Sequence, residues 1–152
     1  MERQKDDDPK KLLHEFYVLQ EERIKVYRSL DEGHKTYLQT SPDYDFQAYR
    51  QVVHNCTEEF NRISKRIIEI EDLFREKYQK GDIADCLKKV QEAERDKLEK
   101  TAVLQLAKQR LQDEPGNDEH SREISELKAM LTGMMEQITD ALEDLRYEGE
   151  GL

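Results

Sequence analysis

The chain has 152 residues, with 35 Asp or Glu against 25 Lys or Arg, and its formal net charge is −10. This length suits one domain, and the charge makes the average surface repel phosphate, so direct nucleic-acid binding is not expected. Charged residues make up 39 % and hydrophobic residues 36 %, and Trp is absent, a balance that favours long helices over a sheet protein.

Residues 1–8 are polar and end in three consecutive aspartates. We expect them to form a disordered acidic amino terminus, which resembles neither a secretory signal nor a transit peptide. The longest apolar run, Phe16 to Leu19, is too short to cross a membrane. These features predict an intracellular protein without a membrane segment.

The first predicted helix covers about residues 9–39, because Asp8 can cap it and Pro9 suits its first position. Its apolar positions alternate in steps of four and three, the spacing of a helix that buries one stripe. Arg23 places a charge in this stripe and Gly33 thins it. The full stripe is Leu12, Phe16, Leu19, Arg23, Val26, Leu30, Gly33 and Tyr37.

The second predicted helix, about residues 45–80, has the most regular stripe in the chain. The turn formers from Thr40 to Asp45 precede it, and Gly81 is expected to adopt the left-handed conformation that often ends a helix. The stripe consists of Phe46, Tyr49, Val53, Cys56, Phe60, Ile63, Ile67, Ile70 and Phe74.

Two further helices are predicted at about residues 83–112 and 119–147, separated by a Pro-Gly break with Asn117 or Asp118 as the next cap. The stripe of the third helix is apolar at its ends and polar in the middle, where it includes Glu94. The stripe of the fourth is regular and contains Ile124, Leu127, Leu131, Met134, Ile138, Ala141 and Leu145. Residues 148–152 should form a frayed tail.

These patterns predict an all-α fold, an elongated, coiled-coil-like antiparallel four-helix bundle with up-down-up-down topology, as a single domain over residues 9–147. The alternative is an elongated hairpin that completes its core by dimerising. Monomer and homodimer therefore both stay open, as does whether the third helix closes the bundle or leaves a binding groove.

Two charges in the apolar stripes and two cysteines are candidate internal features. Arg23 and Glu94 fall at nearly one height in an up-down bundle, which predicts a buried polar layer that fixes register; the alternative is that both side chains extend outwards. Cys56 and Cys86 should lie about 25–30 Å apart along the helices, too far for a disulfide.

No phosphate-binding Gly-rich loop, nucleophile elbow or paired Cys/His motif occurs in the sequence. The four histidines lack the Glu-x-x-His spacing of a bundle metal site. We therefore expect no catalytic residue, no metal and no cofactor, and a chain that is not an enzyme.

Aromatic residues beside an arginine gather around the turn before the second helix, and such residues are favoured anchors in protein interfaces. They predict a partner-binding site; the alternative is that they only cap one end of the bundle. The candidate residues are Tyr37, Tyr44, Asp45, Tyr49, Arg50 and His54, with Phe46 beside them.

Four stretches carry a resemblance to a known family: "LQEERIKVYRSLDEGHKTYL", "YDFQAYRQVVHNCTEEFNRIS", "KLEKTAVLQLAKQ" and "ALEDLRYE". They resemble the "required for excision" B-type domain family, small eukaryotic proteins named for a role in DNA repair, over roughly Leu12 to Tyr147. The family offers no active-site motif to carry over.

The resemblance implies a DNA-repair association, a nuclear location and other proteins, DNA-repair factors among them, as partners. With the acidic charge, it favours a non-catalytic helical adaptor. The alternative is a structural coiled-coil subunit of a cytoskeletal or ciliary assembly, in which case a cytoplasmic location is expected.

Overall fold

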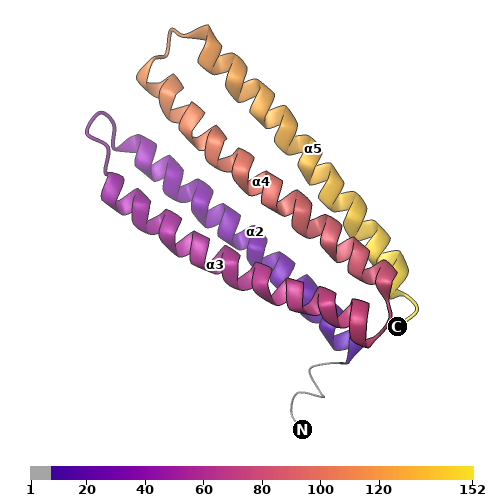
Figure 1. Ribbon diagram of the computed structural model, residues 1–152. Coiled ribbons are helices and arrows are strands. Elements are labelled where there is room, and N and C mark those ends of the chain that lie inside the picture. The colour runs from indigo at the N-terminus through magenta and orange to yellow at the C-terminus, as the bar shows by residue number, and fades with distance from the viewer. Residues whose placement is uncertain (1–7) are drawn as a thin grey trace. The chain divides into compact units, whose positions relative to one another are not determined.

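The computed structural model describes residues 8–152, and the all-α prediction is confirmed (Figure 1). The helices are α2 (Pro9–Gln39), α3 (Phe46–Asp72), α4 (Gly81–Asp113) and α5 (Asp118–Gly149), and a π-helical turn, η1 (Leu73–Lys77), continues α3. Within residues 8–152 the chain forms no strand. The predicted disorder of the amino terminus falls on residues 1–7, which lie outside the described residues.

Side-chain caps fix three of the helix starts. The Asp8 carboxylate accepts a hydrogen bond from the Lys10 N–H at 2.9 Å, with Pro9 at the first position of α2. The Asp45 carboxylate accepts from the Ala48 N–H at 3.1 Å, and the Asn117 side chain accepts from the Glu119 N–H at 2.9 Å. The capping roles predicted for Asp8 and for Asn117 are therefore confirmed.

The reversal between α3 and α4 differs from the prediction. Gly81 does not adopt the left-handed conformation; Gln79 does, with φ of 51°, and Gly81 begins α4. The cause is the π turn, in which the Tyr78 N–H donates to the Leu73 carbonyl at 3.1 Å, five residues back. This wider turn ends the helix before residue 80, so the chain turns two residues earlier than expected.

The chain divides into two compact units. Of the described residues, the first unit comprises 8–88 together with Leu145–Leu152, and the second is Lys89–Asp144. The division falls within α4 and α5. The single domain predicted for residues 9–147 stays a prediction.

In the first unit, α2 and α3 form an antiparallel hairpin (Figure 1). The predicted stripes supply most of its buried side chains, and Gln20 and His34 of α2 are buried outside them. Tyr27 of α2 packs on Phe60 of α3 with ring centroids 4.8 Å apart. Arg66 binds Glu15 across the hairpin through two hydrogen bonds of 2.7 and 2.9 Å. The largest fully buried side chains of α2, α3 and η1 are Leu12, Phe16, Ile63, Ile67, Ile70 and Phe74.

The second unit has a core of its own between α4 and α5. Leu104 and Ala107 of α4 pack with Ile124 and Leu127 of α5, and partly buried leucines at both helices flank them. The neighbouring pair Arg110–Glu123, at 3.6 Å, also joins the two helices. The antiparallel pairing of successive helices predicted for a bundle is thus present in this unit as well.

Two further predictions concern the chain as a whole. Cys56 and Cys86 are both free and buried, as the distance argument required. No helix within residues 8–152 combines the length and apolar character that a membrane span requires.

Candidate protein-binding site at the α2–α3 turn

A single hydroxyl ties together the two ends of the α2–α3 turn. The Thr40 Oγ1 donates a hydrogen bond to the Tyr37 carbonyl at 2.6 Å and accepts one from the Asp45 N–H at 2.9 Å. Asp45 in turn caps α3. The end of α2 and the start of α3 are therefore held to each other by side-chain bonds.

Four rings, His34, Tyr37, Tyr44 and Tyr49, pack against one another at this end of the hairpin and are here called the aromatic cluster. Tyr37 stacks on Tyr49 with centroids 4.6 Å apart and lies 4.9 Å from Tyr44. His34 approaches Tyr49 edge-on at 5.5 Å. Burial raises the pKa of Tyr49, with smaller contributions from Tyr37 and Cys56. Tyr37 and His34 are buried, whereas Tyr44 and Tyr49 are half-buried.

The other predicted residues lie around this cluster without joining its ring contacts. Arg50 is exposed and makes no ion pair within residues 8–152. His54 lies 3.1 Å from Glu58 on the same helix. Phe46, which the stripe placed in the core, is instead 58 % exposed. The partner-binding role of these residues stays a prediction.

Sequence reasoning missed His34 as a member of the cluster. It lies three residues before Tyr37 on α2, a spacing that places both side chains on one helix face. That spacing was the available signal.

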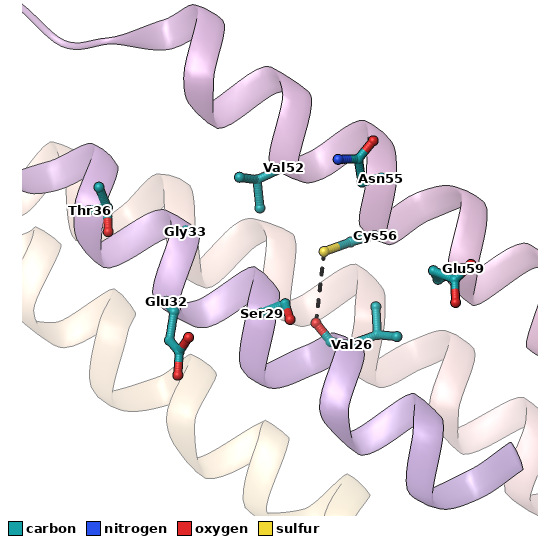
Figure 2. A pocket seen from close by; sticks show the side chains of 9 residues that line it. All are labelled: Val26, Ser29, Glu32, Gly33, Thr36, Val52, Asn55, Cys56 and Glu59. Atoms are coloured by element: carbon teal, nitrogen blue, oxygen red, sulfur yellow. Dashed lines mark hydrogen bonds between the residues drawn. The ribbon is translucent and has the colours of Figure 1, made fainter.

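Sequence reasoning also missed a groove between α2 and α3 (Figure 2). Its volume is about 450 Å³. The α2 residues that line it are Val26, Ser29, Glu32, Gly33 and Thr36, and the α3 residues are Val52, Asn55, Cys56 and Glu59.

Gly33 sets the spacing of the two helices at this groove. A Cβ atom on Gly33 would lie 2.6 Å from the Val52 Cγ1 atom, closer than carbon atoms approach. The residue that only thinned the predicted stripe therefore lies against Val52, where an added side chain would not fit without movement.

The thiol of Cys56 points toward α2 in the groove, with its Sγ 3.8 Å from the Val26 carbonyl oxygen (Figure 2). Burial raises the pKa of this thiol. Cys56 is therefore a neutral donor at physiological pH.

Carboxylates mark both edges of the groove. Glu32 is exposed on α2 and makes no ion pair within residues 8–152. Glu59 on α3 lies 3.0 Å from Arg62, and this hydrogen bond lowers the pKa of the Glu59 carboxyl. Arg62 is also 3.0 Å from Glu22 of α2. Each edge of the groove therefore carries a glutamate, Glu32 from α2 and Glu59 from α3.

The predicted buried polar layer involves one residue from each unit. Arg23 is 2 % exposed and Glu94 is 6 % exposed. Within the second unit, the Lys97 Nζ lies 4.0 Å from the Glu94 carboxylate. The contact between Arg23 and Glu94 stays a prediction. Residues 8–152 contain no group of three or more His, Cys, Asp or Glu side chains arranged to hold a metal ion.

Comparison with known proteins gives a family match. The model of the family described as DNA repair REX1-B matches residues 11–108, which include the aromatic cluster and the groove. The "Required for excision 1-B domain-containing protein" of Bos taurus is 32 % identical over 146 residues, covering 96 % of this chain and 79 % of the relative. The protein of the same name from Mus musculus is 31 % identical over 140 residues, covering 91 % and 80 % respectively. No solved structure matches the chain.

Proposed function

The chain belongs to the DNA repair REX1-B family, and on that premise we propose that it is a non-catalytic helical adaptor that binds other proteins in DNA repair. The family name supplies the association with repair. The adaptor role is argued from the α2–α3 turn, and a nuclear location follows from the same proposal.

The exposure of Phe46 carries the proposal. This ring is 58 % exposed at the first position of α3, between Asp45, which caps the helix, and the half-buried Tyr49. Arg50 extends into solvent from the same turn of the helix. Aromatic residues, Phe included, and Arg are enriched at the cores of protein interfaces, and Arg is among the residues enriched at binding hot spots.

The aromatic cluster supports the proposal because it is ordered before any partner arrives. Tyr37 is stacked on Tyr49, and Thr40 bonds both ends of the turn. Binding to a preordered surface loses less side-chain and loop entropy than binding to a mobile one. The turn therefore offers both an exposed anchor and a rigid base beneath it.

The charge of the chain favours protein over nucleic acid as the partner. Its net charge of −10 repels the phosphate backbone, whose neutralisation by Lys and Arg supplies most of the affinity of non-specific DNA binding. Tight, salt-sensitive DNA binding by the isolated chain would contradict the adaptor proposal.

Partner capture from nuclear extract tests the proposal with three chains. The test variant is the double substitution Phe46→Ala with Arg50→Ala, and the control is Ile68→Ala, which removes an apolar side chain that is 49 % exposed elsewhere on α3. We expect the wild type and the control to retain the same repair proteins and the double variant to lose them. All three should share one melting temperature, because neither change removes a buried group.

Two outcomes would overturn the proposal. One is an unchanged set of captured proteins with the double variant. The other is capture of cytoskeletal or ciliary proteins in place of repair proteins, which would favour the structural-subunit alternative.

A further inference from the structure

We infer that the α2–α3 groove binds an amphipathic helix of a partner protein, one with apolar side chains facing the groove and Lys or Arg along its flanks. This inference rests on the proposed adaptor function and adds to it a second contact surface and a partner chemistry. The groove is distinct from the exposed Phe46, so each can be tested without the other.

The length of the groove fits a helix. Its α2 lining runs from Val26 to Thr36. Ten residues at a rise of 1.5 Å make about 15 Å, whereas helix anchors at positions i, i+3 or i+4, and i+7 span about 10 Å. Three successive anchor side chains therefore fit along the groove.

The walls suit apolar anchors. Val26 and Val52 line the groove from the two helices, and the side chain of Ser29, which also lines it from α2, is small (Figure 2). Two polar atoms of the α3 wall have partners already: the Cys56 thiol donates to the Val26 carbonyl, and the Asn55 side-chain oxygen accepts from the Gln51 amide at 2.9 Å. An apolar side chain entering the groove thus need not satisfy these groups.

The acidic residues of the groove determine which flanking residues a partner helix should carry. Among the nine lining residues, Glu32 and Glu59 are acidic and none is Lys or Arg. Arg62 lies beside the groove, but it is shared between Glu59 and Glu22, so one positive charge faces two negative ones there. Complementary Lys or Arg on a partner would be attracted along both edges, and acidic or phosphorylated segments would be repelled.

The direct test uses the full chain and two synthetic peptides. One is a helical peptide of Leu and Lys with Leu at the anchor spacing, and the other replaces every Lys by Glu. Binding is followed through the methyl NMR signals of Val26 and Val52. We expect the Leu/Lys peptide to shift both signals and the Leu/Glu peptide to shift neither.

Two variants separate binding in the groove from attraction to an acidic protein in general. Ser29→Leu places an apolar side chain in the groove at an exposed position. We expect it to lower the affinity for the Leu/Lys peptide at least tenfold. Glu32→Lys should lower the affinity for the same peptide about three- to fivefold, the effect expected of a charge at the rim of an interface. Glu21→Lys is the matched control, because Glu21 is exposed on α2, does not line the groove and gives the same change in net charge.

The inference is overturned if the Val26 and Val52 signals do not move, or if Glu21→Lys weakens binding as much as Glu32→Lys. A dimeric wild type that Ser29→Leu makes monomeric would also overturn it, since the occupant would then be a second copy of the chain. In the nuclear-extract experiment, partners lost with the double variant Phe46→Ala, Arg50→Ala but kept with Ser29→Leu would reject the groove and leave the adaptor function standing. Partners kept with both variants would reject the adaptor function itself.

Discussion

Substitution of Gly33 by alanine tests the close approach of α2 and α3. The added Cβ would lie 2.6 Å from the Val52 Cγ1 atom and 3.2 Å from the Val52 Cβ atom. A valine in a helix has essentially one favoured rotamer, so its methyl groups cannot easily turn away. The two helices would have to separate locally.

The expected change in the free energy of unfolding is the balance of two effects. Alanine in place of glycine within a helix stabilises by about 1 kcal/mol, whereas overpacking a well-packed contact costs about 1–3 kcal/mol. Gly33→Ala should therefore lower the free energy of unfolding by up to about 2 kcal/mol. In a Val52→Ala background the Cγ atoms are gone, and the same substitution should stabilise by up to about 1 kcal/mol.

A double-mutant cycle of Gly33→Ala and Val52→Ala measures this change of sign. Urea unfolding of the four chains, followed by circular dichroism at helical wavelengths, should give a coupling energy of about 1–3 kcal/mol. The reasoning is refuted if Gly33→Ala has the same effect in both backgrounds, because the two residues would then not contact each other.

Three other predictions address separate parts of the first unit. Gly81→Ala should stabilise the chain by about 0.4–1 kcal/mol in urea unfolding. The reason is that a Cβ atom at this position would meet nothing within 4 Å and that the φ angle of Gly81 is not positive. A loss of stability would mean that Gly81, rather than Gln79, is left-handed. Glu15→Gln should lower the free energy of unfolding by about 1 kcal/mol at low salt, because it removes one charge of the pair that two hydrogen bonds join to Arg66. The loss should be smaller in 1 M salt, where charges are strongly screened. Equal losses at both salt concentrations would exclude an electrostatic origin. Burial raises the pKa of Tyr49 above its unfolded value, so the contribution of its neutral hydroxyl to stability is complete below about pH 10 and is lost as the pH rises through the folded pKa. Tyr49→Phe should therefore reduce the loss of stability at alkaline pH, measured as the free energy of unfolding between pH 8 and 11. The same pH profile for the variant and the wild type would contradict this prediction.

The parts of the fold that follow from local rules were predictable from sequence. The apolar spacing gave the long helices, and Asp8 and Asn117 marked their starts because a capping side chain acts within two or three residues. The all-α fold class can be predicted from such local patterns because they extend over long segments of the chain.

The parts that depend on contacts between helices were not predictable. Phe46 continues the apolar stripe of α3 by spacing, yet it is exposed. Gly33 carries no side chain whose periodicity could show that Val52 would lie against it. The groove exists only because residues 26–36 of α2 approach residues 52–59 of α3, and no pattern within one helix predicts that contact.

The π turn after α3 also has a consequence for changes in chain length. Its Tyr78 N–H reaches back five residues to Leu73, one more than in an α-helix, so the turn holds one residue beyond what continuous α-helical bonding needs. Deleting one residue within Leu73–Lys77 would let α-helical bonding run through this turn, whereas the same deletion inside α2 or α3 would rotate every later side chain by about 100°. The chain therefore has a position near the end of its second long helix where a shorter sequence can keep the helix intact.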